Sequence, residues 1–105
     1  MSSRSGLVGI PGAAAYASSK AALASLTREM ANDMAPLNVR VNAIAPGEID
    51  TAILSPDTAK IVEHDVPMQR LGTPHEVAEA IYFLCSNRSS YINGSELHIN
   101  GGQHV

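Results

Sequence analysis

Val39-Arg40-Val41-Asn42-Ala43-Ile44 is a run rich in β-branched side chains, and it ends at Pro46-Gly47. A run of this kind, bounded by turn-forming residues, is typical of a β-strand. Downstream, Thr73-Pro74-His75-Glu76 predicts a helix start, with Thr73 as N-cap, a proline at the first helical position and a glutamate that closes a capping box. The alternation in Glu96-Leu97-His98-Ile99 predicts a second strand. Strand, helix and strand at this spacing predict a parallel βαβ unit with a right-handed crossover.

Upstream of this unit, Ala14 to Met34 is rich in alanine, with apolar side chains at three- and four-residue intervals. This periodicity predicts one long helix that ends before Pro36. Because the segment carries little charge on any face, we expect it to be buried on more than one side, against the sheet and against a second helix, of this chain or of another subunit. Thr51 to Met68 is predicted to be a loop with a short helix around Thr58 to Glu63.

Composition narrows the functional classes. With 105 residues the chain can form one domain with a modest core. A net charge of −3 without a basic stripe argues against a nucleic-acid partner, and no stretch is apolar enough to cross a membrane. The single cysteine, Cys85, excludes an internal disulfide and suits a cytoplasmic protein. The four histidines show no metal-ligand spacing, so we expect no metal site: His64, His75, His98 and His104.

Tyr16 and Lys20 are four residues apart in the predicted long helix, so they lie on one face of it. A phenol with a pKa of about 10 becomes a useful base at neutral pH when that pKa falls by about three units, or about 4 kcal/mol. An ammonium about 4 Å away supplies about that much at an effective dielectric constant of about 20, but only about 1 kcal/mol in bulk water. The pair therefore predicts a proton donor beside its activator in a shielded site, the alternative being a half-buried tyrosine beside a solvated lysine.

Several motifs accompany this pair in a fixed order. Ser3 precedes it, while Asn42 to Thr51 and Ile99-Asn100-Gly101-Gly102 follow it. Together they resemble the C-terminal part of the short-chain dehydrogenase/reductase family, with 3-oxoacyl reductase-like members closest, over Ser2 to His104. The glycine-rich turn that begins such proteins has no match here, because the glycines between Gly6 and Gly12 have a spacing that indicates a loop.

The resemblance implies an α/β fold, the C-terminal part of a doubly wound parallel-sheet (Rossmann-like) domain that lacks the N-terminal dinucleotide-binding half. Residues 1–105 would then be one partial domain, corresponding to about the last two fifths of such an enzyme. Asn100-Gly101-Gly102 would be the closing turn after the last strand, with a structural role.

The resemblance also implies catalytic roles. Tyr16 would be the general acid/base, Lys20 would activate it and bind the nicotinamide ribose, and Ser3 would polarise the substrate carbonyl. The reaction would transfer hydride between NAD or NADP and a small carbonyl or alcohol substrate. For Ser3, the alternative is a hydroxyl in a flexible N-terminal tail.

Cofactor-binding residues implied by the resemblance are Tyr16 and Lys20 on the helix and, after the first predicted strand, Pro46, Gly47, Ile49 and Thr51. The backbone at Ile49 would meet the nicotinamide carboxamide, and the Thr51 hydroxyl would bind carboxamide or phosphate. An ordinary turn after a strand is the alternative for this stretch.

Two functions stay open. One is an NAD(P)-dependent oxidoreductase present as its C-terminal piece; the other is a catalytically inactive fragment that acts only as a self-associating module. For both we expect that the chain alone binds no dinucleotide. We also expect a two-fold symmetric homo-oligomer, formed through Pro74 to Cys85 and Glu96 to Ile99, with the Tyr16-bearing helix as a second interface.

Overall fold

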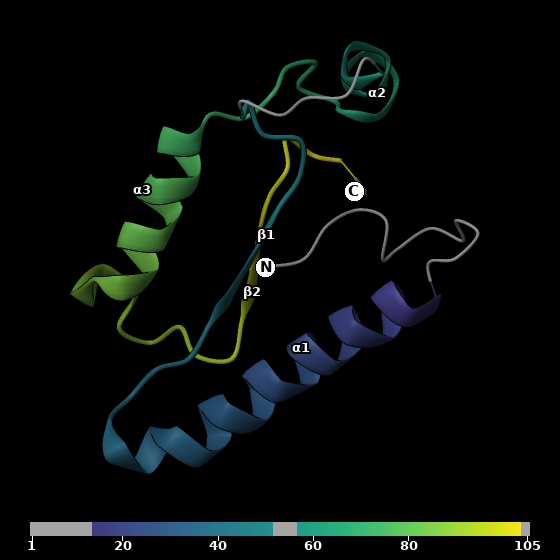
Figure 1. The fold of residues 1–105 in the computed structure, drawn as a ribbon. Helices are drawn as coiled ribbons and strands as arrows, with labels where there is room; N and C mark the ends of the chain where they lie inside the picture. The colour runs from purple at the N-terminus through teal and green to yellow at the C-terminus, as the bar shows by residue number, and fades with distance from the viewer. Residues whose placement is uncertain (1–13, 52–56, 104–105) are drawn as a thin grey trace.

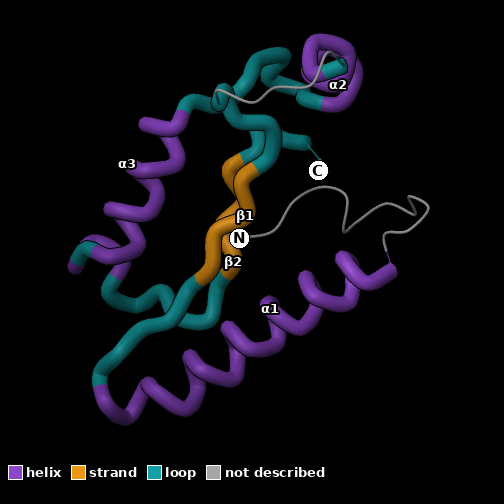
Figure 2. Tube along the Cα trace, in the orientation of Figure 1, coloured by secondary structure: helices purple, strands orange, loops and turns teal. Residues whose placement is uncertain are grey.

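A computed structural model describes residues 14–51 and 57–103 of the chain, so Ser3 and the glycines of the N-terminal segment lie outside it. The elements follow in the order α1 (Ala14–Met34), η2 (Ala35–Leu37), β1 (Ala43–Pro46), α2 (Thr58–Asp65), α3 (Pro74–Cys85), η3 (Asn87–Ser89) and β2 (Glu96–Ile99) (Figures 1 and 2). β1 and β2 pair in parallel, with Ala43 opposite Glu96 and Pro46 opposite Ile99. The predicted α/β class and the parallel pairing of the two strands are confirmed.

The helix predictions hold because their signals are local. α1 has the predicted bounds, and after the short η2 turn the chain reverses at Asn38, which has a left-handed φ of 60°. α3 begins with the predicted capping box, in which the Thr73 side chain accepts from the Glu76 N–H and the Glu76 side chain accepts from the Thr73 N–H. α2 ends at Asp65, two residues beyond the predicted end at Glu63.

The first strand differs from its prediction, since β1 begins at Ala43 rather than Val39. Before that point the backbone ladder is incomplete. The Gly94 N–H donates to the Val41 carbonyl (2.8 Å), and side-chain amides supply the other bonds: the Val41 N–H donates to Asn93 Oδ1 (2.9 Å), and the Ser95 N–H donates to Asn42 Oδ1 (2.9 Å). Parallel pairing starts only where β2 begins. The β-branched composition of residues 39–42 therefore produced extended chain, but not a paired strand.

Arg40 joins this extended segment to the far end of α3. Its guanidinium donates four hydrogen bonds, to the carbonyls of Leu84 (3.0 Å), Ser86 (3.0 Å) and Ile92 (3.1 Å) and to the Ser89 hydroxyl (3.1 Å). Carbonyls at the end of a helix lack partners within the helix and carry partial negative charge. A guanidinium there supplies the missing hydrogen bonds and a compensating positive charge. Arg40 thus fixes how α3 leads into β2.

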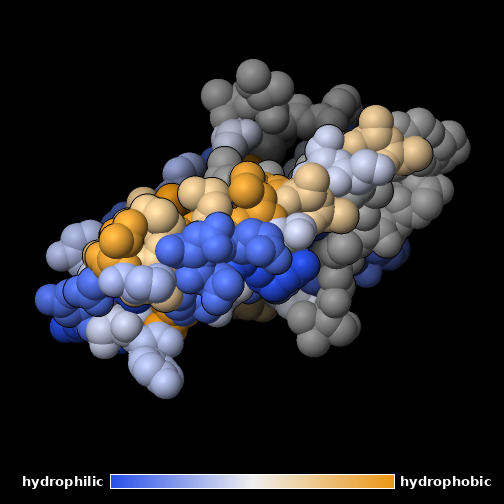
Figure 3. Space-filling model, turned by 90° about the horizontal axis from the view of Figure 1, so that it is seen from below, coloured by the Kyte–Doolittle hydropathy of each residue, from blue (hydrophilic) through white to orange (hydrophobic). Residues whose placement is uncertain are grey.

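The chain is more open than a compact domain of its size. Its radius of gyration is 15.1 Å, against about 13 Å for a compact domain of 100 residues. Among the described residues, the buried hydrophobic side chains are only Ala31, Ala45 and Val66. Figure 3, which views the molecule from below, shows apolar side chains open to solvent beside a band of hydrophilic ones.

Within the single chain α1 is not buried on more than one side, and the covering of its second face by a helix of another subunit stays a prediction. Along α1, Thr27 and Ala31 are buried, whereas Leu26 and Met30 are 54% and 42% exposed. The reason is geometric: a helix of 21 residues is about 30 Å long, while two paired strands lie about 5 Å apart. Figure 1 shows the C-terminal half of α1 beside the segments that lead into the strands, where Asn93 Nδ2 donates to the Ala31 carbonyl (3.1 Å), and the start of the helix farther from the strands.

Candidate functional site

The turn that follows β1 is anchored on two sides. On one side the Gly47 N–H donates to the Ile99 carbonyl at the end of β2 (2.9 Å). On the other, the Gly72 N–H donates to the Glu48 carbonyl (2.9 Å) and the Asp50 N–H donates to the Gly72 carbonyl (2.8 Å). These bonds fix the backbone of Pro46 to Asp50 between the last strand and the start of α3.

This anchoring leaves the backbone N–H and C=O of Ile49 facing outward. Ile49 forms a parallel bridge with Gly72, in which the hydrogen bonds are made by the Glu48 carbonyl and the Asp50 N–H. The N–H and C=O of Ile49 itself therefore point away from Gly72. Within residues 14–51 and 57–103, the Ile49 N–H makes no backbone hydrogen bond. It is therefore available to a polar group such as a carboxamide oxygen.

The turn is also packed closely against the C-terminal end of the chain. A Cβ on residue 47 would lie 2.7 Å from Asn100 Cβ, so only glycine fits there without a shift. Gly101 has φ +60° and faces Val66, whose Cγ1 would be 2.9 Å from an added Cβ. Glycine at both positions lets the turn after β1, the segment after α2 and the turn after β2 pack against one another.

Asn100 organises the meeting point. Its Oδ1 accepts from the Gly102 N–H (3.1 Å), its Nδ2 donates to the Gln103 carbonyl (2.9 Å), and its carbonyl accepts from the Gln103 N–H (3.1 Å). The Gly101 carbonyl in turn accepts from the Met68 N–H (3.1 Å). The Asn100–Gln103 turn therefore holds both the segment after β1 and the segment after α2, as expected of a closing turn.

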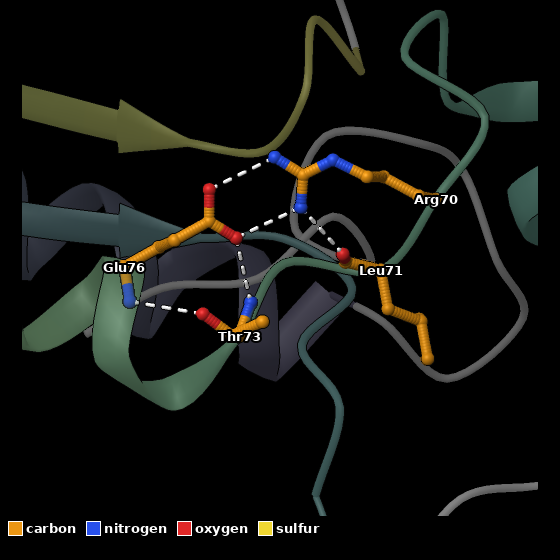
Figure 4. A network of polar contacts seen from close by, with 4 residues as sticks. All are labelled: Arg70, Leu71, Thr73 and Glu76. Atoms are coloured by element: carbon orange, nitrogen blue, oxygen red, sulfur yellow. Dashed lines mark hydrogen bonds and ion pairs between the residues drawn. The ribbon is translucent and has the colours of Figure 1, made fainter.

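An ion pair fixes the entry to α3 (Figure 4). The Arg70 guanidinium binds both carboxylate oxygens of Glu76, at 2.8 and 2.9 Å, and also donates to the Leu71 carbonyl (3.0 Å). The hydrogen bond from Arg70, together with that from the Thr73 N–H, lowers the pKa of Glu76 from 4.5 to about 2. The sequence predicted the capping box but not Arg70, whose place six residues before Glu76 follows from the path of the loop.

Glu76→Gln is expected to lower the melting temperature at pH 7, because glutamine can cap the helix but cannot pair with Arg70. A carboxyl whose pKa is depressed in the folded state contributes stability above its unfolded pKa and loses it as pH falls through the folded pKa. The difference between the two proteins should therefore shrink as pH falls from 4.5 to about 2. Thermal melts across this range measure it, with exposed Glu79→Gln as control; a difference that persists unchanged to pH 2 contradicts the assignment.

A hollow of about 310 Å³ lies between the start of α3, the turn after β1 and the Asn100–Gln103 turn. Glu48, Arg70, Glu76 and His98 line it. Lys20 is not among the described residues that line it. Within the described ranges, no group of three or more His, Cys, Asp or Glu side chains could hold a metal ion.

The predicted site residues occupy two regions. Pro46 is the last residue of β1, Gly47 and Ile49 lie in the anchored turn that follows it, and Thr51 comes directly after this turn and is exposed. Tyr16 and Lys20 lie one helical turn apart in the first turns of α1. Figure 1 shows this end of α1 apart from the turn after β1, so the structure does not set the two regions side by side.

A protein family described as Enoyl-(Acyl carrier protein) reductase matches residues 1–104. Protein FixR of Bradyrhizobium diazoefficiens is 63% identical over 91 residues, covering 87% of this chain and 33% of that protein. The 3-oxoacyl-(acyl-carrier-protein) reductase FabG of Aquifex aeolicus is 43% identical over 105 residues, covering 97% of this chain and 42% of that protein.

Solved structures agree with these relatives. The 3-oxoacyl-(acyl-carrier protein) reductase of Brucella melitensis superposes with a TM-score of 0.85 at 35% identity, covering 99% of this chain and 40% of that one. A 4-hydroxyisoleucine dehydrogenase complexed with NADH and succinate superposes with a TM-score of 0.83 at 36% identity, covering 96% and 42%. The chain thus spans about two fifths or less of the length of these proteins.

Proposed function

The chain belongs to the short-chain dehydrogenase/reductase family, and from this premise we propose that it forms the nicotinamide-facing part of an NAD(P)-dependent oxidoreductase that interconverts a carbonyl and an alcohol. The observation that supports this most is the stretch Pro46–Thr51 with its anchored turn, in which the Ile49 N–H faces outward and has no backbone partner in the part of the chain that the structure describes. A preformed donor of this kind suits a carboxamide oxygen, and the close packing at Gly47 keeps it in place.

Each residue then has one role. The Ile49 N–H and the Thr51 hydroxyl orient the nicotinamide ring, and when bound the dinucleotide supplies or accepts the hydride. Tyr16 gives a proton to the substrate oxygen or takes it back, Lys20 stabilises the phenolate, and Ser3 donates a hydrogen bond to the same oxygen. The similarity to a dehydrogenase solved with NADH, and to 3-oxoacyl reductases, supports a nicotinamide cofactor and a small carbonyl or alcohol substrate.

Residues 1–105 are proposed to be a single partial domain. They contain no match to the glycine-rich strand–turn–helix that holds a dinucleotide pyrophosphate, and that contact supplies much of the family's cofactor affinity. We therefore propose that these residues alone bind neither NAD nor NADP, and that they form the site only together with such a turn. A cytoplasmic location stays a prediction.

A specific observation favours the second candidate, a self-associating module. Large apolar side chains are exposed on α3 at Ile81, Tyr82 and Phe83, on β2 at Leu97, and on α1 at Leu26 and Met30. Apolar surface of this extent usually marks an interface. We propose that it is covered in a two-fold homo-oligomer. None of the helices in the described ranges combines the length and apolar character needed to cross a membrane.

Two proteins separate the candidates: the 105-residue chain, and a chimera in which residues 1–105 replace the matching segment of the Aquifex aeolicus reductase. The chain alone should show no micromolar affinity for NADH or NADPH by calorimetry, and light scattering should give a mass above 11.0 kDa. The chimera should bind either NADH or NADPH with a micromolar Kd. A chimera that folds without binding either one would remove the oxidoreductase assignment, and a well-folded monomer of the chain would remove the oligomer.

A further inference from the structure

The side-chain amide of Gln103 is buried and has no hydrogen-bond partner among residues 14–51 and 57–103. Gln103 is 1% exposed, and within these ranges neither its Oε1 nor its Nε2 is bonded, although its backbone N–H and carbonyl are both bonded to Asn100. Buried polar atoms without partners are rare, because no hydrogen bond offsets the free energy lost when such atoms leave water. The amide is therefore able to form hydrogen bonds if the neighbouring backbone is rearranged.

The amide lies against the anchored turn. Its Oε1 would be 3.0 Å from a Cβ on residue 47, beside Asn100. The absence of a side chain at Gly47 therefore makes room for the amide, and Gly47 is two residues before the outward-facing N–H of Ile49. The same C-terminal turn also accepts the Met68 N–H. A movement of the turn after β1 would therefore change the surroundings of the Gln103 amide.

We propose that Gln103 is a positioning residue for dinucleotide binding. Its amide has no partner among the described residues, and it gains hydrogen bonds with the Gly47 carbonyl and the Glu48 N–H when the nicotinamide end is seated on the turn. This role rests on the proposed function, since the turn must be the nicotinamide site. Because the hydrogen bonds that the amide gains offset part of the free energy needed to move the turn into its ligand-bound state, the amide strengthens binding without touching the reacting atoms.

The test replaces Gln103 with methionine, which is similar in length but offers neither the amide donor nor its carbonyl acceptor. In the chimera described above, Gln103→Met should raise the melting temperature of the cofactor-free protein by a few degrees, because a buried unpaired amide is removed. The same substitution should weaken NADH or NADPH binding by about five- to tenfold, measured by calorimetry. Gln69→Met, at the chain's exposed other glutamine, should change neither quantity.

Opposite changes in stability and affinity identify the positioning role, because a merely structural glutamine would lower both or affect stability alone. Unchanged dinucleotide affinity in a folded Gln103→Met protein, or a lowered melting temperature, overturns the role of Gln103 and leaves the proposed function standing. Gln103→Leu is the second variant, and failure of both variants to fold also overturns the role. Absence of dinucleotide binding by the unsubstituted chimera removes the proposed function and the role together.

Discussion

Tyr16→Phe in the chimera should lower turnover by about 10²- to 10⁴-fold, the range typical of lost general acid/base catalysis, while dinucleotide affinity stays within about twofold. Phenylalanine keeps the aromatic ring but cannot give a proton to the substrate oxygen. Because proton transfer is needed in the transition state and not for binding, kcat should fall with little change in the dinucleotide Kd. Steady-state oxidation of NADPH or NADH with a 3-oxoacyl substrate measures the first quantity, and calorimetry measures the second.

Tyr91→Phe is the matched control, because Tyr91 is fully exposed and the same hydroxyl is removed. It should leave turnover unchanged. Turnover of Tyr16→Phe within tenfold of the unsubstituted chimera would exclude Tyr16 as the acid/base. Equal loss of affinity and turnover would instead show that the phenol hydroxyl serves binding.

Arg40→Met should lower the free energy of unfolding of the chain by about 2–4 kcal/mol, the largest stability effect expected of any side chain considered. The substitution keeps the apolar stem and removes four hydrogen bonds to Leu84, Ser86, Ser89 and Ile92. Hydrogen bonds to charged groups contribute about 1.5–3 kcal/mol each, but water replaces some of them at this partly exposed site, so the sum is not additive. The carbonyls at the end of α3 would lose their cation.

Urea denaturation followed by circular dichroism measures this loss. The proteins are compared at one concentration, because association adds to the apparent stability. Arg28→Met on the exposed part of α1 is the control and should change the midpoint little. An Arg40→Met chain with an unchanged midpoint would show that the end of α3 does not need the guanidinium.

The sequence alone determined the elements whose signals lie within a few residues. The bounds of α1 follow from its alanine-rich periodicity, and α3 begins where Thr73 and Glu76 satisfy each other across one turn. The parallel pairing of β1 with β2 followed from the length of the crossover between them. In the candidate site, the sequence predicted that the strand ends at Pro46-Gly47 and that a turn follows as far as Thr51, because a Pro-Gly pair favours a turn.

Only the tertiary structure decided the features that depend on partners far along the chain. Pairing at β1 begins at Ala43 because β2 begins opposite it, and Arg40 finds acceptors 44 to 52 residues away. The exposure of α1 depends on how wide a sheet lies beneath it, which its own residues do not encode. The unpaired amide of Gln103 exists only because the C-terminal turn packs on Gly47. Local propensity acts over one or two turns of chain, whereas burial and polar satisfaction are settled by the contacts between distant segments.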